Sequence, residues 1–397
     1  MRQVVDVVVF VGGLSLVAAT LASAVRTVVL PRGVQSKLTT AVFLTMRALF
    51  RVRLGRAPTY ERRDRVMAPY APLSLLTLAG VWLALVGTGF AAMYWSLAGR
   101  TLREAVTLSG SSLLTLGFLR PDDLPTIFLA FTEASLGLGL LALIITYLPS
   151  IYTTFSRREA AVAHLEVRAG SPPSGVEILE RFARISWLGG LAGLWDRWEG
   201  WFVETEESHT SFPALVFFRS PQPDHSWVTA AGAVLDAAAL ASSTMEEHDP
   251  DAELMIRAGT LCLRRIADYF GLEYDPDPRP TDEITVAREE YDEAYDRLAA
   301  AGIKLKPDRD QAWRDFAGWR VNYDTVLVTL AGLVGAPYAP WSSDRSVRPA
   351  VRLMRGRGRR PRRGARRPEL RTTRHWGRPE RREDDHGAAG TRREQQG

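Results

Sequence analysis

The sequence predicts an all-α membrane protein with three transmembrane helices, a re-entrant loop between the second and the third, and a helical cytoplasmic domain. Three observations lead to this prediction. Apolar runs occupy residues 7–24, 73–97 and 124–148, and about 20 helical residues suffice to cross the ~30 Å hydrocarbon core of a bilayer. The connection between the last two runs is itself apolar and rich in Ser, Thr and Gly. Beyond it, residues 156–341 are more polar and show helical periodicity.

The composition indicates four parts of unequal character. Residues 1–70 are an amino-terminal transmembrane anchor with a basic cytoplasmic loop, residues 71–155 a two-helix membrane module, residues 156–341 the helical domain, and residues 342–397 an Arg-rich tail predicted to be disordered. The formal charge of +5 is therefore an average over these parts. The single cysteine, Cys262, excludes an intrachain disulfide and a multi-cysteine metal site, and its apolar neighbours predict a buried thiol.

The first apolar run ends in Ala22-Ser-Ala24, which imitates a signal-peptidase site. The segment that follows, residues 26–70, is strongly basic and has only Glu61 and Asp64 as acids. Short loops this basic stay on the cytoplasmic side. The run is therefore predicted to be an uncleaved anchor in the cell membrane, with the amino terminus outside and the carboxy-terminal domain in the cytoplasm. Within the loop, residues 38–54 form either a helix at the membrane interface, facing anionic lipids, or one packed on the soluble domain.

The connection at residues 105–118 reads as a short amphipathic helix followed by Thr115, Leu116, Gly117 and Phe118. A polar return through residues 120–123 completes the pattern of a re-entrant pore loop. The alternative interpretation is an ordinary connection between two membrane helices. The four residues resemble the selectivity filter of the potassium-channel family, which reads Thr-Val-Gly-Tyr-Gly or a close variant. The chain departs from that pattern at Leu119, where the family has a second glycine, and at Arg120, where an acid is usual.

The resemblance covers about a fifth of the chain and implies a pore-loop cation channel, with K⁺ as the permeant ion and no cofactor. In that family four copies surround one axis, so the implied assembly is a homotetramer in the lipid bilayer. Backbone carbonyls of Thr115, Leu116, Gly117 and Phe118 would then line the ion path. Glycine permits the positive φ angles that turn carbonyls inward, so Leu119 is expected to resist the family's backbone geometry at its position.

Several residues of the second membrane helix have two interpretations each. Gly137 and Gly139 are either a gating hinge or sites of close helix packing. Glu133, the one acid of this span, faces a cavity or braces the short helix of the pore loop. Pro149 kinks or ends the helix. Glu104, in the first turn of that short helix, is interpreted as a capping residue.

The domain is predicted to begin with a helix at 156–168. A second helix is predicted to start at the capping-box pattern of Ser174 and Glu177. Further helices are predicted at 228–243, 252–270, 284–301 and 311–333, and a short extended segment at 212–218. The tryptophans at 187, 195, 198 and 201 are assigned to its core rather than to the membrane interface. Glu206 and His209 have the spacing of two metal ligands on one helix face, but this motif occurs once, which favours a structural pair or a solvated loop. No nucleotide-binding fingerprint is present.

Three functions follow as hypotheses. The first is passive cation conduction through a tetrameric pore. The second is a non-conducting membrane scaffold or sensor with a degenerate pore loop, which Leu119 and Arg120 favour. The third is a membrane-tethered enzyme that depends on Glu206 and His209. The tail is expected to contact anionic lipid or nucleic acid by charge alone, without sequence-specific nucleic-acid recognition.

Overall fold

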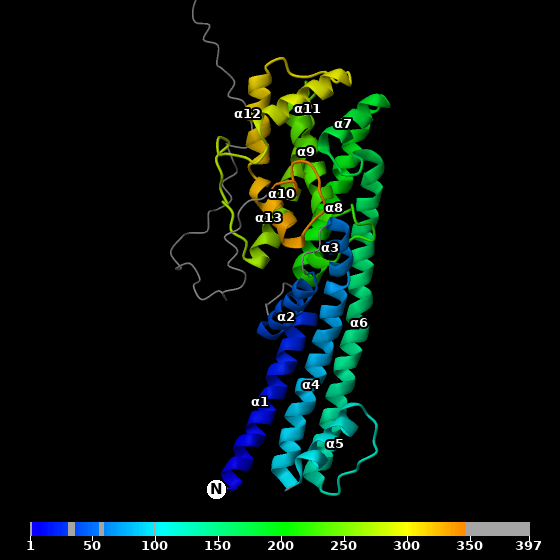
Figure 1. The fold of residues 1–397 in the computed structure, drawn as a ribbon, viewed down its shortest axis with the longest axis vertical. Coiled ribbons are helices and arrows are strands. Elements are labelled where there is room, and N and C mark those ends of the chain that lie inside the picture. The colour runs from blue at the N-terminus through cyan, green and yellow to red at the C-terminus, as the bar shows by residue number, and fades with distance from the viewer. Residues whose placement is uncertain (1, 31–35, 55–58, 99, 346–397) are drawn as a thin grey trace, which may run out of the picture. The chain divides into compact units, whose positions relative to one another are not determined.

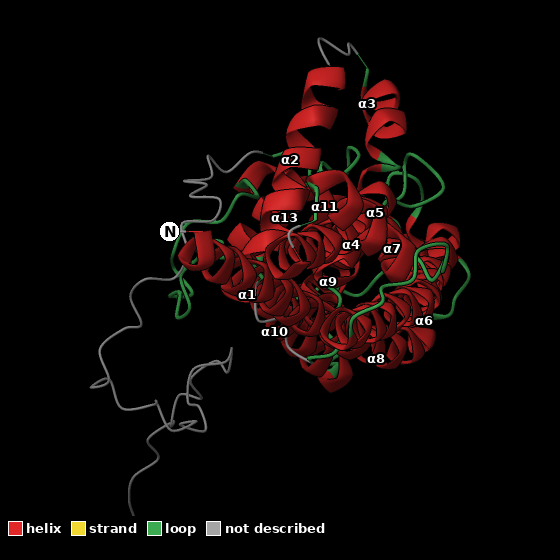
Figure 2. Ribbon diagram, turned by 90° about the horizontal axis from the view of Figure 1, so that it is seen from below, coloured by secondary structure: helices red, strands yellow, loops and turns green. Residues whose placement is uncertain are grey.

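The computed structural model describes residues 2–30, 36–54, 59–98 and 100–345, and within these ranges the chain forms helices and no β-strand (Figures 1 and 2). The predicted tail lies almost entirely outside the described residues. The helices are α1 (Arg2–Val28), α2 (Lys37–Leu54), α3 (Tyr60–Met67), α4 (Tyr70–Ala98), α5 (Leu102–Leu113), α6 (Leu124–Ala169), α7 (Gly175–Arg184), η1 (Leu188–Gly190), α8 (Leu191–Ser211), η2 (Pro213–Phe217), α9 (Trp227–Thr244), α10 (Pro250–Phe270), α11 (Arg288–Ala300), α12 (Arg309–Arg320) and α13 (Asp324–Val334).

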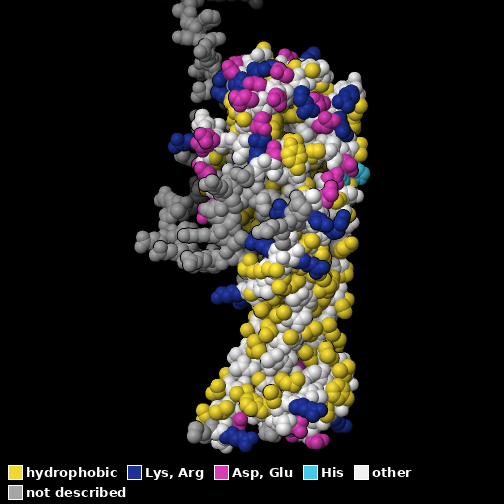
Figure 3. All heavy atoms as spheres, in the orientation of Figure 1, with side chains coloured by type: hydrophobic (Ala, Val, Ile, Leu, Met, Phe, Trp, Pro, Cys, Tyr) yellow, Lys and Arg dark blue, Asp and Glu magenta, His cyan; other side chains and the backbone are white. Residues whose placement is uncertain are grey.

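Three of the described segments are long and apolar enough to cross a membrane: α1, the segment Tyr60–Leu97 and α6. They confirm the predicted number of membrane-spanning helices by length and composition. Hydrophobic side chains cover the part of the surface formed by these helices, and charged side chains lie at either end of it (Figure 3).

Helix α1 packs along α4 through two glycines. A Cβ atom added to Gly13 would lie 2.5 Å from the carbonyl oxygen of Gly89, and one added to Gly89 would lie 2.6 Å from a methyl group of Val17. Small residues let membrane helices approach closely in this way. Nearer the other end of α1, the indole nitrogen of Trp82 donates a hydrogen bond to Ser23 Oγ at 3.3 Å. The first apolar run is therefore an integral part of the helix bundle.

Helix α2 combines features of both interpretations given for residues 38–54. Its Val42 side chain is buried, and Arg47 donates a hydrogen bond to the Leu333 carbonyl of α13 at 3.3 Å. Nearer its C-terminal end, Leu49 and Val52 are 59% and 81% exposed. The helix thus contacts the domain and also presents an apolar face that a bilayer interface would cover.

Helix α6 passes through Pro149 and ends at Ala169, so the alternative of a helix end at Pro149 is wrong, and the predicted charged helix at 156–168 is confirmed as the continuation of the same helix. The reason is tertiary packing beyond the proline, where Ile151, Phe155 and Val162 are buried against the domain. Arg158 also contacts the domain there: Nη1 donates to the Leu215 carbonyl at 2.8 Å, and Nη2 donates to the Phe218 carbonyl at 2.8 Å. One helix therefore joins the membrane part to the domain.

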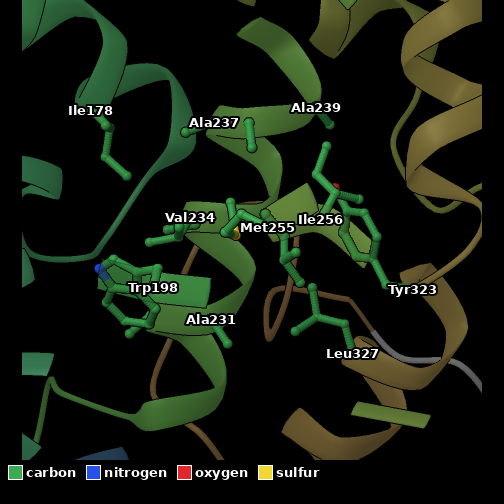
Figure 4. Close-up of a cluster of buried hydrophobic side chains, with 14 of the residues drawn as sticks. Ile178, Trp198, Ala231, Val234, Ala237, Ala239, Met255, Ile256, Tyr323 and Leu327 are labelled. Atoms are coloured by element: carbon green, nitrogen blue, oxygen red, sulfur yellow. The ribbon is translucent and has the colours of Figure 1, made fainter. Parts of the chain in front are cut away.

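The domain is built around α9, an alanine-rich helix whose residues are buried along its whole length. Small side chains on α9, such as Ala231 and Ala237, face larger ones from neighbouring helices (Figure 4). Trp195, Trp198 and Trp201 are buried in this core, as predicted, whereas Trp187 is 54% exposed and stacks on Phe182. The Cys262 thiol is fully buried, and burial raises its pKa well above the usual value.

The predicted helix at 311–333 is wrong as a single element, because the chain breaks into α12 and α13 between Arg320 and Asp324. A buried polar cluster lies at the break. Arg320, which is 0% exposed, pairs with Asp236 of α9 and with Asp324 at 2.8 Å, and the Tyr323 hydroxyl donates to Asp236 at 2.9 Å. The i,i+4 spacing of Arg320 and Asp324 also occurs within continuous helices, so the cluster lies at the break without requiring it.

Three smaller differences concern the ends of elements. Residues 212–218 contain the 3-10 helix η2 instead of an extended segment. Ser174 does precede α7, but its side chain makes no capping hydrogen bond, and Glu177 pairs with Arg181 instead. The predicted helix at 284–301 begins later, at Arg288. The helices predicted at 228–243 and 252–270 are confirmed as α9 and α10 to within two residues.

Candidate functional site

The candidate site is the connection between α4 and α6, and it begins with the short helix α5. Thr101 and Glu104 form a complete capping box at its start, which confirms the interpretation of Glu104 as a capping residue. The buried side chains of Ala105, Leu108 and Leu113 belong to one hydrophobic cluster with residues of α4 and α6. Helix α5 therefore packs against both membrane helices as well as connecting them.

The end of α5 lies far along both neighbouring helices. A Cβ atom added to Gly137 of α6 would lie 2.4 Å from the Leu113 carbonyl oxygen, and one added to Gly87 of α4 would lie 3.2 Å from the Leu113 side chain. At about 1.5 Å per residue, Gly137 is about 20 Å along α6 from its first residue, Leu124. Gly137 thus permits a close backbone contact, and Gly139, which meets nothing within 4 Å, does not share that role.

Glu133 holds α5 in this position. Its Oε1 atom accepts a hydrogen bond from Ser109 Oγ at 2.5 Å, and its Oε2 atom accepts one from the Tyr94 hydroxyl of α4 at 2.8 Å. The Ser109 hydroxyl also lies 2.9 Å from the Gly87 carbonyl. Glu133 is 0% exposed, so within the described chain it braces α5 and does not face a cavity.

Because this carboxylate is the shared acceptor of two buried hydroxyls, Glu133→Ala is expected to lower stability by about 1–3 kcal/mol. Glu133→Gln keeps one acceptor oxygen and should cost clearly less. The measurement is the midpoint of thermal unfolding in detergent, compared among the wild type and the two variants. Equal midpoints for Glu133→Ala and the wild type would contradict the bracing role.

After α5 the backbone of the predicted filter residues turns back on the helix end. The N–H groups of Leu116 and Gly117 donate to the Ser111 carbonyl at 2.8 and 3.3 Å, and the N–H of Thr115 donates to Ser112. The N–H of Leu119 donates to Ser111 Oγ at 3.3 Å. Within the described part of the chain, no donor binds the carbonyl oxygens of residues 115–118. Among the described residues, the N–H groups of Thr115, Leu116 and Gly117 therefore have acceptors, whereas the carbonyl oxygens of residues 115–118 have no donor.

Two of these residues have left-handed backbone conformations: Thr115 with φ 55° and Gly117 with φ 69°. Leu119 does not, so its side chain causes none of the strain expected for a residue in a glycine position. The side chains of Leu116 and Phe118 are 60% and 61% exposed. The four predicted filter residues thus lie on one exposed loop. The strained left-handed conformation, which was expected at Leu119, occurs at Thr115.

The loop closes where α6 starts. Asp123 caps α6 by accepting hydrogen bonds from the backbone and hydroxyl of Thr126, and it pairs with Arg100 at 3.2 Å. Arg120 is exposed, and no acidic partner is found for it among the described residues. Its positive charge is therefore free to act on whatever ion approaches this end of the molecule.

Sequence reasoning missed the serines of α5. Ser109 and Ser111 link α5 to Glu133 and to the loop backbone, but serines in a short apolar helix show no periodicity that would reveal such partners. The only signal was their abundance in a segment placed between two membrane helices. Polar side chains in such surroundings require partners inside the protein, and this requirement could have identified them.

The metal-site hypothesis in the domain has no geometric support. Glu206 pairs with Arg265, whereas His209 is buried, with Nε2 3.0 Å from Arg158 Nη1 and Nδ1 2.8 Å from the Thr205 carbonyl. Burial, and secondly the Arg158 guanidinium, hold the pKa of His209 well below its usual value, so the ring is neutral near pH 7. In the described ranges, no group of three or more His, Cys, Asp or Glu side chains is arranged to hold a metal ion.

Comparison with known proteins adds no assignment to this geometry: no protein-family model matches the chain, and neither the curated proteins nor the solved structures contain a match.

Proposed function

We propose that this protein conducts cations, with K⁺ as the preferred ion, through a pore formed by four copies of the chain. The observation that carries the proposal is the backbone of residues 115–118, whose carbonyl oxygens have no donor among the described residues while the neighbouring N–H groups bind α5. A dehydrated cation needs such oxygens, arranged in rings around an axis. One chain supplies one segment, so a ring requires several copies.

The depth of α5 supports the same proposal. Its last residues contact α6 about 20 Å from the start of that helix, which is more than half of a ~30 Å hydrocarbon core. Irregular backbone at such depth is tolerated where it lines a watery cavity or is buried in protein, and not where it faces lipid. A homotetramer would bring the exposed Leu116 and Phe118 into protein surroundings and leave the carbonyls on a central path.

The proposal includes an orientation. The basic segment after α1 favours the cytoplasmic side for α2 and for the domain. The amino terminus and the loop at residues 114–123 then face the outside. In this arrangement α6 leads from the proposed filter to the cytoplasmic domain.

A second candidate is a non-conducting scaffold or sensor that has the same membrane architecture. The observation that favours it is Arg120, which is exposed and lies three residues after Gly117. Four copies of this cation near a pore entrance would repel permeant cations. The domain, held on α6 through Arg158, would then carry the function.

The test is ion flux from liposomes that contain the purified full chain, with K⁺ and Na⁺ compared. Gly117→Ala is expected to lower K⁺ flux at least about tenfold, because alanine at a positive φ costs about 1 kcal/mol in each copy. Gly110→Ala is the matched control: Gly110 lies in α5, and a Cβ atom there meets nothing within 4 Å.

The outcomes separate the candidates. K⁺-selective flux that Gly117→Ala lowers at least about tenfold and Gly110→Ala leaves unchanged supports the channel. Flux that is sensitive to Gly117 but not selective would retain the pore and reject K⁺ preference. Absence of flux in the wild type, for a preparation shown to be tetrameric by cross-linking, would favour the scaffold.

A further inference from the structure

A cavity lies where the membrane helices meet the domain, well away from the candidate filter. The cavity itself has a volume of about 80 Å³, room for one small group, and it opens to solvent, so the rest of a ligand would lie outside its mouth. Its walls come from both parts of the chain: Arg26 of α1, Phe43 of α2 and Tyr147 of α6 on one side, and Ala214 and Phe217 of η2 on the other.

The cavity has one apolar side and one polar side. The apolar side is formed by Phe43, Phe217 and neighbouring leucine, proline and phenylalanine side chains. The polar side contains Arg26 together with hydroxyl groups of α1 and of the start of α2. None of the described residues that line the cavity is acidic. A ligand with an apolar body and an anionic head therefore matches it, and a cationic ligand does not.

Arg26 is available to such a head group. It lies in the last turn of α1, where the apolar span ends, and it is exposed. In the described part of the chain it has no ion pair or hydrogen bond through its side chain. By contrast, the hydroxyls of Thr27 and Thr39 already bind each other at 2.8 Å. Among the described lining residues, Arg26 is thus a charged donor that has no partner.

We propose that an anionic phospholipid from the adjacent leaflet binds at the mouth of this cavity, with its phosphate on Arg26 and a short segment of one acyl chain entering between Phe43 and Phe217. The charge of the wall and its position at the end of three membrane helices both favour this occupant. The lipid would contact α1, α2 and η2 together. This site is separate from the proposed filter and does not depend on conduction.

The experiment measures binding of radiolabelled dioleoylphosphatidylglycerol to the purified full chain in detergent. Saturable binding is expected, and Arg26→Gln should weaken it about tenfold, because a charge-assisted hydrogen bond to the phosphate is lost. Ala214→Phe, which places a ring in the cavity, should lower the number of bound lipids. Arg53→Gln is the control, since Arg53 is an exposed arginine of α2 outside the cavity.

Competition identifies the ligand. Dioleoylphosphatidylcholine and inorganic phosphate are expected to displace the label poorly, because the first lacks net negative charge and the second lacks an apolar body. Displacement by inorganic phosphate as efficient as by unlabelled phosphatidylglycerol would overturn the lipid assignment. Unchanged binding in Arg26→Gln, or an equal loss in Arg53→Gln, would overturn the site itself.

Discussion

Replacing Gly137 by alanine is expected to abolish K⁺ flux, whereas the same replacement at Gly139 should leave it within about twofold of the wild type. The first substitution places a methyl group 2.4 Å from the Leu113 carbonyl oxygen, which is backbone and cannot rotate away. Helix α5 must then shift, and the filter segment that follows it shifts as well. The second substitution meets nothing within 4 Å and replaces a helical glycine by a better helix former, a gain of up to about 1 kcal/mol.

This pair also separates the two interpretations of the glycines. Both variants keep the length of α6, and both should elute as monodisperse protein, so a difference in liposome flux reports on the site. Loss of flux in Gly137→Ala alone indicates that Gly137 is needed for close packing against α5. Loss in Gly139→Ala alone would instead identify a hinge at Gly139 and would contradict the packing argument.

The largest loss of stability is expected for Arg320→Met. Arg320 is 0% exposed and pairs with Asp236 and Asp324. Its removal leaves two carboxylates in the core without a counter-charge, which costs about 3–5 kcal/mol. Unfolding is followed by tryptophan fluorescence in denaturant, because Trp195 and Trp198 lie in the core of the same domain.

Arg297→Met provides the comparison. Arg297 pairs with Glu180 on the surface, and its side chain is 50% exposed. Surface pairs contribute at most about 1 kcal/mol, so this variant should unfold close to the wild type. If the two variants unfold at the same denaturant concentration, the buried cluster does not stabilise the domain as argued.

The membrane helices and most helices of the domain were predictable because apolar periodicity and length determine them locally. The break between α12 and α13 was not, since Arg320 and Asp324 look like surface residues until Asp236, far away in the sequence, is placed beside them. Local helix propensity does not depend on a partner that is distant in the sequence, so it could not indicate this contact. The same reason left open whether α6 ends at Pro149, because Arg158 holds the part of the helix beyond the proline to carbonyls of the segment after α8.

At the candidate site, sequence reasoning identified which residues share the loop but not their backbone conformations. Gly117 has the positive φ that its residue type permits, whereas the positive φ of Thr115 has no signature in the residue type. Glu133 was assigned two possible roles, and only the positions of Ser109 and Tyr94 distinguish them. The contacts between neighbouring helices therefore decided between the two roles of Glu133, which its position along one helix could not do.

Because α6 is one continuous helix, the number of residues between its contacts at Gly137 and Arg158 is more constrained than the identity of those residues. One end is held at Gly137 by α5, and the other at Arg158 by the domain, with about 31 Å of continuous helix between them. Each added or removed residue would turn one contact about 100° relative to the other, since about 3.6 residues make a turn. Exchanges of apolar residues between Gly137 and Arg158 are thus compatible with the fold. A single insertion, by contrast, would rotate the domain relative to the loop and break one of the two contacts.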